Sequence, residues 1–434
     1  MGYLWTEEVE MPTFPPLEGD RETDVLVIGG GMAGILCAYF LEKAGVDYLL
    51  VEGKRIGQGI TKGTTAVLSA QHSTLYTDLI GTFGMEQARQ YLKANLKAVD
   101  VFREMAETIP CDWEERPSIL YSTEDKETME REAKMVQSLG FGAEFQKECP
   151  VPVPVMGAVR FPGMAQFHPL KFLAGVAKGL SIFEHTFVHR MDQTVAFTGT
   201  GRITAKKIVV ATHFPFFNRR GLYFMKLYQK RSFVVALERA AQIICTAEDH
   251  SENGMYFRNY KNLLLVGGGD RRTGAQGGGF DVVRAFVRKA FPKAKEIHAW
   301  ANQDCMSLDG VPYIGTYSPG MPNVFVATGF NAWGMTGSMV AASLLSHMVL
   351  GQKDAEACLF SPHRSFFSAQ LFSNLSTVLV DFLTPTKKRC THMGCALKWN
   401  PQEHSWDCPC HGSRFDERGV VVNNPAMKNN RMGP

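Results

Sequence analysis

The stretch DVLVIGGGMAGILCAYFLEKAGVDYLLVE, residues 24–52, decides the fold of the N-terminal part of the chain. A short apolar run suited to a buried strand leads into a turn with the spacing G-x-G-x-x-G, formed by Gly29, Gly31 and Gly34. Such glycines permit a tight turn, close approach of a pyrophosphate to the backbone, and close packing of the helix that follows. The pattern predicts a strand–turn–helix–strand unit that binds a dinucleotide.

The rest of the unit agrees with this prediction. The apolar pattern predicts a helix from Met32 to Ala44, closed by Gly45. The next strand ends in Glu52, twenty-three residues after Gly29, where a carboxylate can accept hydrogen bonds from ribose hydroxyls. A glycine-rich turn without a ligand would explain the glycines but not the acid at this distance.

Two further stretches favour FAD over NAD. The segment 53–72, after Glu52, is rich in Gly and Thr and offers N–H groups and hydroxyls along a long dinucleotide. Far downstream, a strand from Asn323 to Ala327 runs into a Gly-rich turn and a long apolar helix. The N-terminus of that helix can face the electron-rich end of a flavin ring, where its dipole stabilises negative charge.

Composition limits the other possibilities. The chain has 434 residues, 45% of them hydrophobic and 21% charged, which suits a globular protein of two or three domains. A net charge of +3 gives no argument for a nucleic-acid partner. The N-terminus lacks the apolar region of a secretory signal, and the most apolar window, Gly334 to Leu350, contains Thr, Ser and His347. We therefore expect a cytoplasmic protein with a buried core helix in that window and no membrane span.

The stretch Cys390 to Gly412 (CTHMGCALKWNPQEHSWDCPCHG) holds four of the ten cysteines and three of the twelve histidines. Two short loops offer two thiolates and two imidazoles, from Cys390, His392, Cys408 and His411. A Cys₂His₂ zinc site uses these residue types. A Rieske [2Fe–2S] centre uses them too, with both histidines on one iron and both cysteines on the other.

The two loops, CTHMGC and CPCHGS, resemble the two boxes of the Rieske family. The resemblance implies that Cys390, His392, Cys408 and His411 hold a [2Fe–2S] cluster and that Cys395 and Cys410 form a disulfide. Such a disulfide is unusual in a cytoplasmic protein. Most strands of a full Rieske domain are missing, so we expect a cluster-binding lobe, residues 388–428, that leans on the rest of the protein. A linker helix, residues 356–387, would connect the two.

Residues 20 to 355 resemble the FAD-dependent oxidoreductases of the glycine oxidase and D-amino-acid oxidase (DAO) type. The resemblance implies an α/β fold in which a Rossmann-like FAD-binding domain is interleaved with an α+β substrate domain, followed by the small all-β Rieske lobe. The FAD-binding domain would comprise residues 20–82, 156–221 and 305–355. The substrate domain would comprise residues 83–155 and 222–304.

The same resemblance assigns roles along the FAD molecule. It places the ADP half on Gly29, Gly31, Gly34 and Glu52. It places Thr64 and Thr65 near the middle of the cofactor, and the turn from Gly329 to Gly334 near the isoalloxazine ring. A second Gly-rich stretch, residues 266–279, is predicted to be a loop over the substrate domain because no βαβ unit follows it.

The stretch WANQDCMSLDGVPYIG, residues 300–315, bears on the substrate. The family pattern has an Arg four residues after the Trp that anchors a substrate carboxylate, and Asp304 occupies this position. A carboxylate here favours a cationic amine over a simple α-amino acid, and a structural Asp bonded to backbone is the alternative. Candidates for lining the flavin face are His72, alternatively a satisfied core histidine, and Arg258, alternatively a solvated arginine. Neighbouring Cys305 is either a covalent flavin attachment or a buried thiol.

These observations predict a flavin–Rieske oxidoreductase with FAD and a [2Fe–2S] cluster. It would oxidise the C–N bond of an amine or amino acid by hydride transfer to FAD. Single electrons would then pass through the cluster to an unknown one-electron acceptor, a protein or a quinone. Two alternatives stay open: an FAD oxidase with a structural metal lobe, and a redox or electron-transfer protein without an organic substrate.

Overall fold

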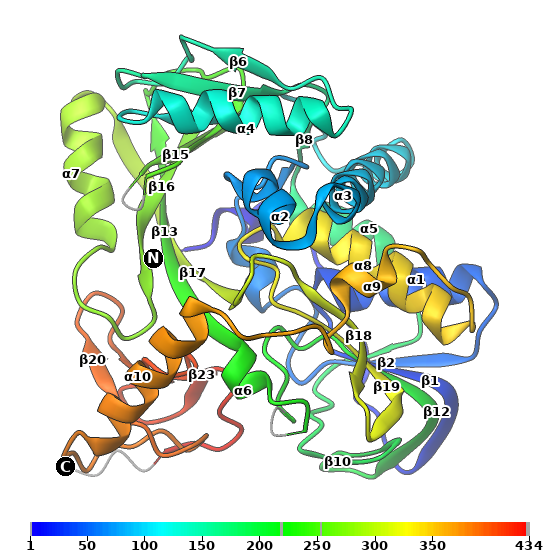
Figure 1. The fold of residues 1–434 in the computed structure, drawn as a ribbon. Helices are drawn as coiled ribbons and strands as arrows, with labels where there is room; N and C mark the ends of the chain where they lie inside the picture. Colours follow the sequence, from blue (N-terminus) through cyan, green and yellow to red (C-terminus); the bar gives the residue numbers. More distant parts are fainter. Residues whose placement is uncertain (1, 218–219, 252–253, 431–434) are drawn as a thin grey trace.

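The structure, a computed structural model, describes residues 2–217, 220–251 and 254–430 of the chain. Within these ranges two large β-sheets lie side by side, and a small terminal lobe packs against the second of them (Figure 1). The interleaved α/β fold expected from the sequence is confirmed.

The first sheet is built around the predicted dinucleotide unit. Strand β1 pairs in parallel with both β2 and β12, and β12 pairs in parallel with β19. The antiparallel strands β10, β11 and β18 extend the sheet. Its strands are β1 (Arg21–Ile28), β2 (Tyr48–Val51), β9 (Ile182–Phe183), β10 (Arg190–Asp192), β11 (Val195–Phe197), β12 (Arg202–Val210), β18 (Tyr313–Ser318) and β19 (Met321–Thr328).

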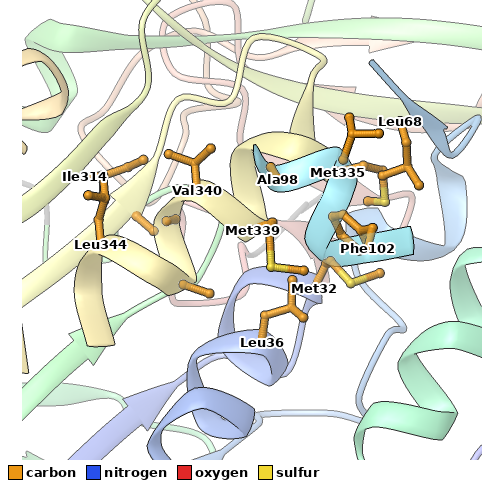
Figure 2. Close-up of a cluster of buried hydrophobic side chains, with 14 of the residues drawn as sticks. Met32, Leu36, Leu68, Ala98, Phe102, Ile314, Met335, Met339, Val340 and Leu344 are labelled. Carbon is orange, nitrogen blue, oxygen red and sulfur yellow. The ribbon is translucent and has the colours of Figure 1, made fainter. Parts of the chain in front are cut away.

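Helix α8 (Gly334–Val349), in the apolar window, is the centre of the largest hydrophobic core. It packs against α1 (Met32–Lys43) and α3 (Met85–Ala106). Figure 2 shows Met335 and Met339 of α8 lying beside Met32 of α1 and Phe102 of α3. The predicted buried core helix and the predicted first helix are therefore confirmed. In the described ranges no helix has the length and apolarity needed to cross a bilayer.

The second sheet carries helices α4 (Lys126–Ser138) and α7 (Phe280–Ala290) against it. Helix α2 (Leu75–Phe83) bridges α3 and α4. The strand order is β17 (Lys295–Ser307), β13 (Leu227–Glu238), β16 (Leu263–Arg272), β15 (Tyr256–Tyr260), β14 (Thr246–Asp249), β5 (Ser118–Ser122), β7 (Gly157–Phe161) and β6 (Glu144–Gln146). Strand β7 thus pairs here, although the sequence grouped residues 156–221 with the FAD-binding domain, and β17 crosses the expected boundary at residue 304.

Short elements complete the body of the protein. A small sheet joins β3, β8 and β4, and short helices lie at the chain start and around the first sheet. These elements are η1 (Leu4–Thr6), η2 (Ile60–Gly63), β3 (Val67–Leu68), β4 (Glu114–Glu115), β8 (Ala165–Gln166), α5 (Pro169–Val176) and α6 (Tyr223–Lys226).

Two sequence expectations need correction. The linker is not one helix but two, α9 (Ala357–Phe360) and α10 (Ala369–Leu383), because Pro362 interrupts the helical hydrogen bonding. The Gly-rich stretch 266–279 is not all loop, since its first part belongs to β16. Gly267 is needed in that strand because a Cβ there would lie 1.8 Å from the ring of Tyr256.

The terminal lobe is a small antiparallel sheet of β20 (Lys398–Asn400), β21 (Ser405–Asp407), β22 (Arg414–Asp416) and β23 (Val421–Asn423). Its own core consists of the four box cysteines with Leu397, Phe415 and Ala426. The lobe and α10 lie together at the lower left of Figure 1, beside the lower ends of β13 and α7. A core this small cannot stabilise a domain alone, so the contacts with the body are essential.

Candidate cofactor sites and substrate cavity

A cavity of about 800 Å³ runs from the glycine turn of the first sheet to the second sheet and the terminal lobe. Its volume lies within the range of ligand pockets. The turn at Gly29–Gly31, the end of β2 at Glu52 and the start of α8 at Gly334 line one part of it. Strand β17 and the lobe segment 421–424 line another.

The three glycines of the turn differ in what requires them. A Cβ at Gly29, where φ is +114°, would lie 2.5 Å from Ala211 O, and one at Gly34 would lie 1.9 Å from Gly29 O. At Gly31 the nearest atom would be Thr61 Oγ1 at 3.5 Å, an ordinary contact. Gly29 and Gly34 are therefore required by backbone packing. The missing side chain of Gly31 instead leaves room in the cavity at the N-terminus of α1, which suits a pyrophosphate.

Glu52 is held rigidly at the cavity wall. Its Oε2 accepts a hydrogen bond from Gly30 N–H and its Oε1 accepts one from Lys54 N–H, both at 2.8 Å. Burial raises the pKa of this carboxyl, while the two backbone donors lower it. A carboxylate fixed in this way keeps acceptor capacity for ribose hydroxyls.

The remaining residues predicted along the cofactor lie unequally around the cavity. Thr64 lines the large cavity, and its Oγ1 accepts a hydrogen bond from Ala66 N–H. Gly334, the first residue of α8, also lines it. Thr65 lines a smaller adjoining cavity. Gly329 lines neither of the two and packs behind the turn against Leu227 and Ser307.

The turn before α8 has a strained backbone. Asn331 and Ala332 adopt φ values of +52° and +70°, which cost energy for residues with side chains. Asn331 holds the turn by donating from Nδ2 to Gly329 O at 2.7 Å and accepting from Ser307 N–H at 2.8 Å. Phe330 and Ala332 also line the large cavity. The sequence did not predict this, because neither residue type is typical of a ligand site.

The smaller cavity, of about 130 Å³, lies on one face of the second sheet and adjoins the large cavity. Asn302, Asp304, Thr64 and Ala332 line both. A ligand in the smaller cavity would therefore lie next to a cofactor in the larger one.

Asp304 stands at this junction. Its Oδ2 accepts a hydrogen bond from Ser232 Oγ at 3.2 Å, so the side chain is bonded to a hydroxyl group and not to the backbone. Burial raises the pKa of Asp304 to about 6, and the neighbouring cations Arg231 and Lys230 partly oppose the rise. The side chain is thus a partly buried carboxylate beside both cavities.

Arg258 lines the smaller cavity but is committed to backbone carbonyls. Its Nη1 donates to the carbonyl oxygens of Thr65, Ala66 and Phe167. Burial lowers its pKa to about 9. Arg258 is therefore not the solvated arginine that the sequence left as an alternative. It is buried and holds the loop that carries Thr64 and Thr65.

His72 and Cys305 line neither cavity. The ring nitrogens of His72 lie 2.7 Å from Tyr91 Oη and 2.8 Å from Ser69 O, and the ring stacks on Trp333 at 4.6 Å. Burial lowers the pKa of His72 to about 3, which keeps the ring neutral. Cys305 is buried in the core with Tyr313, and burial raises its pKa to about 12. The structure thus places His72 behind Trp333, a wall residue of the smaller cavity.

The two boxes of the terminal lobe converge on one buried centre. The Sγ atoms of Cys395, Cys408 and Cys410 lie within 4.8 Å of one another, and Cys390 is buried with them. The rings of His392 and His411 lie 5.0 Å apart. Neither ring nitrogen of the buried His411 has a hydrogen-bond partner, and burial lowers its pKa to about 3.

This donor set fits a [2Fe–2S] cluster. To bind a metal, a histidine must be neutral and a cysteine must be a thiolate, and buried nitrogens without partners are rare unless they bind something. Cys390, Cys408, His392 and His411 would hold the cluster as the Rieske boxes imply. Cys395 and Cys410 are free thiols in the structure, so their disulfide stays a prediction.

The body of the protein supplies the support that the lobe lacks. Gln229 Nε2 donates to the carbonyl oxygen of His411 at 2.6 Å, and Gln303 Nε2 donates to that of Gly412 at 2.8 Å. Arg272 donates to the carbonyl oxygens of Pro409, at 2.8 Å, and Cys410, at 3.1 Å. The second box, residues 408–413, is therefore held in place by side chains of β13, β16 and β17.

A buried ion-pair network joins the same surfaces. Arg231 of β13 pairs with Glu403 of the lobe, with Nε and Oε2 3.1 Å apart and side-chain exposures of 4% and 11%. Arg414 pairs with Glu403 at 3.0 Å and with Asp407 at 2.8 Å. The expectation that the lobe leans on the body is confirmed.

Gln229 also connects the lobe with the large cavity. Its Oε1 lies 3.1 Å from Nε2 of His213, a residue that lines that cavity. One side chain thus contacts both a cavity residue and the backbone of His411, a predicted cluster ligand. No sequence pattern marks Gln229, since a lone Gln in a strand is typical of many surfaces.

Comparison with known proteins identifies the class. The family described as "FAD dependent oxidoreductase" (DAO) matches residues 24–348, and the family "Rieske [2Fe-2S] domain" matches residues 380–432. The chain belongs to the DAO family of FAD-dependent oxidoreductases and carries a C-terminal Rieske domain. Its cofactors are FAD and a Rieske [2Fe–2S] cluster.

One relative matches the two-part organisation over its whole length. The Rieske 2Fe-2S iron-sulfur protein YhfW of Bacillus subtilis is 31% identical, over 98% of this chain and 96% of its own. Gamma-glutamylputrescine oxidoreductase of Escherichia coli is 25% identical, over 81% of this chain and 90% of its own. Glycine oxidase from Geobacillus kaustophilus shares the fold, with a TM-score of 0.67, 20% identity and coverage of 80% and 100% of the two chains.

Replacing Gly31 tests the FAD cradle. In Gly31→Val the protein can accept the Cβ, but the added methyl groups enter the cavity. Overpacking of this kind costs about 1–3 kcal/mol, or roughly ten- to a hundredfold in FAD affinity. Flavin absorbance per chain and thermal melting measure the two effects. Gly142→Val, at a glycine with open space outside both cavities, is the control and should keep its flavin. Full FAD occupancy in Gly31→Val would contradict the placement.

A pair of histidine variants tests the cluster. His411→Ala should abolish the Rieske signal in electron paramagnetic resonance and lower the iron content, while flavin absorbance stays unchanged. His404→Ala is the matched control, because His404 lies in the same stretch but is exposed and pairs with Glu417. Loss of the signal in both variants, or in neither, would rule out the assigned ligand set.

Proposed function

We propose that this protein is an FAD-dependent amine dehydrogenase that passes electrons singly through its Rieske cluster to an external acceptor, a protein or a quinone. The observation that carries the proposal is the place of Asp304. Its carboxylate stands where the cofactor cavity meets the smaller cavity, at the position where the family pattern has a carboxylate-binding Arg. A protonated amine suits this carboxylate, whereas the carboxylate of an amino acid would be repelled.

Different residues of the chain would have different roles in such a reaction. When bound, FAD accepts a hydride from the carbon beside the amine nitrogen, and the cluster takes electrons one at a time. Asp304 would orient the amine by a charge-assisted hydrogen bond, with Ser232 fixing the carboxylate. The closely packed sheet and Trp333 would keep water from the reacting carbon.

The wall of the large cavity supports the electron route. Residues 421–424 of the terminal lobe line the cavity that also holds the FAD cradle. Gln229 connects that cavity with His411. Two cofactors in such close positions suit a two-electron to one-electron converter. The E. coli relative, named for a substituted diamine, adds support for an amine substrate.

Anaerobic mixing with amines and amino acids tests the proposal. A true substrate should bleach the flavin and then produce the signal of the reduced Rieske cluster. In His411→Ala the flavin should still bleach, but reduction of an added one-electron acceptor should stop. Rapid oxygen consumption by His411→Ala at the rate of the unaltered protein would favour the oxidase alternative. Failure of every amine to bleach the flavin would contradict amine oxidation.

Asp304→Asn tests the role of the carboxylate. The variant keeps the shape of the side chain but removes a charge-assisted hydrogen bond of about 1.5–3 kcal/mol, so kcat/KM for an amine should fall roughly ten- to a hundredfold. FAD content should not change. Because a cation needs the ionised carboxylate and the pKa of Asp304 is about 6, kcat/KM of the unaltered protein should rise with pH through this value. A variant with normal turnover and lowered melting temperature would assign Asp304 a structural role.

A further inference from the structure

The smaller cavity is lined by three carboxylates from three strands of the second sheet. They are Asp304 of β17, Asp270 of β16 and Glu248 of β14. Asp304 also lines the large cavity, whereas Asp270 and Glu248 line only the smaller one. The three acids therefore extend from the cofactor cavity into the substrate domain.

Asp270 is directed into the cavity by a β-bulge. The pairing of β13 with β16 shifts register between Arg231 and Phe233, so that Gly269 and Asp270 face Ser232 together. Gly269 has a φ of +62°, and a Cβ there would lie 2.5 Å from Gly279 O. Only glycine fits this position, and such bulges re-aim side chains next to active sites. The Gly-rich stretch that the sequence left unexplained thus places a carboxylate in the cavity.

The polar atoms around this cavity are not satisfied within the protein. Oε2 of Glu248 and Oδ1 of Asp270 are buried without a hydrogen-bond partner. The same holds for Oγ1 of Thr246, a lining residue that is only 3% exposed. A buried polar atom left in this state costs about 1–3 kcal/mol, and such atoms in a cavity indicate a missing partner.

The described part of the chain provides no ion-pair partner for these acids. Within residues 2–217, 220–251 and 254–430, none of the three acids forms an ion pair with a Lys, Arg or His. Of the basic residues near them, Arg231 is paired with Glu403, and Arg258 of β15 is bonded to backbone carbonyls. Lys230 of β13 acts on Asp304 and Asp270 only through its charge.

The pKa values of the three acids rise from Asp304 through Asp270 to Glu248. Burial, together with the charge of Asp304, raises the pKa of Asp270 to about 7. Burial raises the pKa of Glu248 to about 8, with added effects of Asp270 and of Asp249 on the same strand. Tyr256 of β15, whose pKa is also raised by burial and these carboxylates, lines the cavity in neutral form. Each acid thus acts on the next, in a row that starts at Asp304.

We propose that the smaller cavity binds a diamine, with one ammonium group at Asp304 and the second between Asp270 and Glu248. The proposal rests on the proposed function for the oxidised nitrogen, and adds a site for a second cation that does not react. The unpartnered oxygens of Glu248, Asp270 and Thr246 accept hydrogen bonds from that second ammonium, which has three donors. An amino acid is excluded because its carboxylate would enter a cavity of like charge.

Calorimetric binding to the FAD-loaded protein, with putrescine and butylamine as probes of equal carbon number, tests this inference. The unaltered protein should bind putrescine more tightly. Glu248→Gln and Asp270→Asn should each weaken putrescine binding roughly ten- to a hundredfold and leave butylamine binding nearly unchanged. Glu144→Gln is the control, because Glu144 lies on β6 of the same sheet but lines neither cavity.

The outcomes separate this inference from the proposed function. Equal affinity for the two amines, or a preference for putrescine that survives in both variants, would overturn the diamine site even if both amines were oxidised. Selective putrescine binding that the variants abolish would support the site even if no amine bleached the flavin. In that second case only the proposed reaction would fail.

Stability against pH gives a second measurement. A folded-state pKa of about 8 for Glu248 means that the folded protein holds a proton which the unfolded chain loses near pH 4. This proton stabilises the fold less as pH rises toward 8. Glu248→Gln should therefore melt at a higher temperature than the unaltered protein at pH 9, and putrescine should raise the melting temperature of the unaltered protein more than that of the variant. A lower melting temperature of Glu248→Gln at pH 9 would overturn the assignment, since it would make Glu248 a structural residue.

Discussion

The buried contact between Arg231 of β13 and Glu403 of the terminal lobe is the interaction on which the two-cofactor arrangement depends. Removing Glu403 would leave the buried charge of Arg231 without its ion-pair partner, at about 3–5 kcal/mol. The lobe has only four short strands among the described residues and a core made largely of its own cysteines. It cannot offset such a loss internally. The flavoprotein sheet therefore acts as the base on which the cluster boxes are assembled.

The pleat of the second sheet explains how the same two strands can contact the terminal lobe and also line the smaller cavity. Side chains alternate between the two faces of a strand. On β13, Gln229 and Arg231 contact the lobe while Ser232 lines the smaller cavity. On β17, Gln303 contacts the lobe and the next residue, Asp304, lines the smaller cavity. The smaller cavity and the contacts with the lobe thus lie on opposite faces of the same two strands, and a shift of the strand register by one residue would exchange them.

The sequence predicted the parts of the site that are local in the chain. The glycine turn, Glu52 and the two cysteine boxes each lie within a short stretch whose spacing has a physical meaning. Gln229, Arg231 and Glu248 act only through pairing between distant strands, so no spacing marks them. Asp270 was hidden for a different reason. Its flanking glycines are typical of a loop, and only the strand register shows that they form a bulge. Asp304 was predicted from the sequence because the family pattern has an Arg, a residue of opposite charge, at this position.

The row of acids also couples the cavity to protons in a definite direction. With pKa values of about 6, 7 and 8 from Asp304 outward, the acid next to the cofactor cavity ionises first. Near neutral pH Asp304 is charged while Glu248 keeps its proton, because burial disfavours the charged form of Glu248 and the charge of Asp270 adds to this effect. An ammonium group arriving at Glu248 stabilises the charged form and lowers its pKa. If the proposed diamine binds, its second ammonium group should therefore release a proton from Glu248, and the negative charge left on the carboxylate partly balances the positive charge of the ligand.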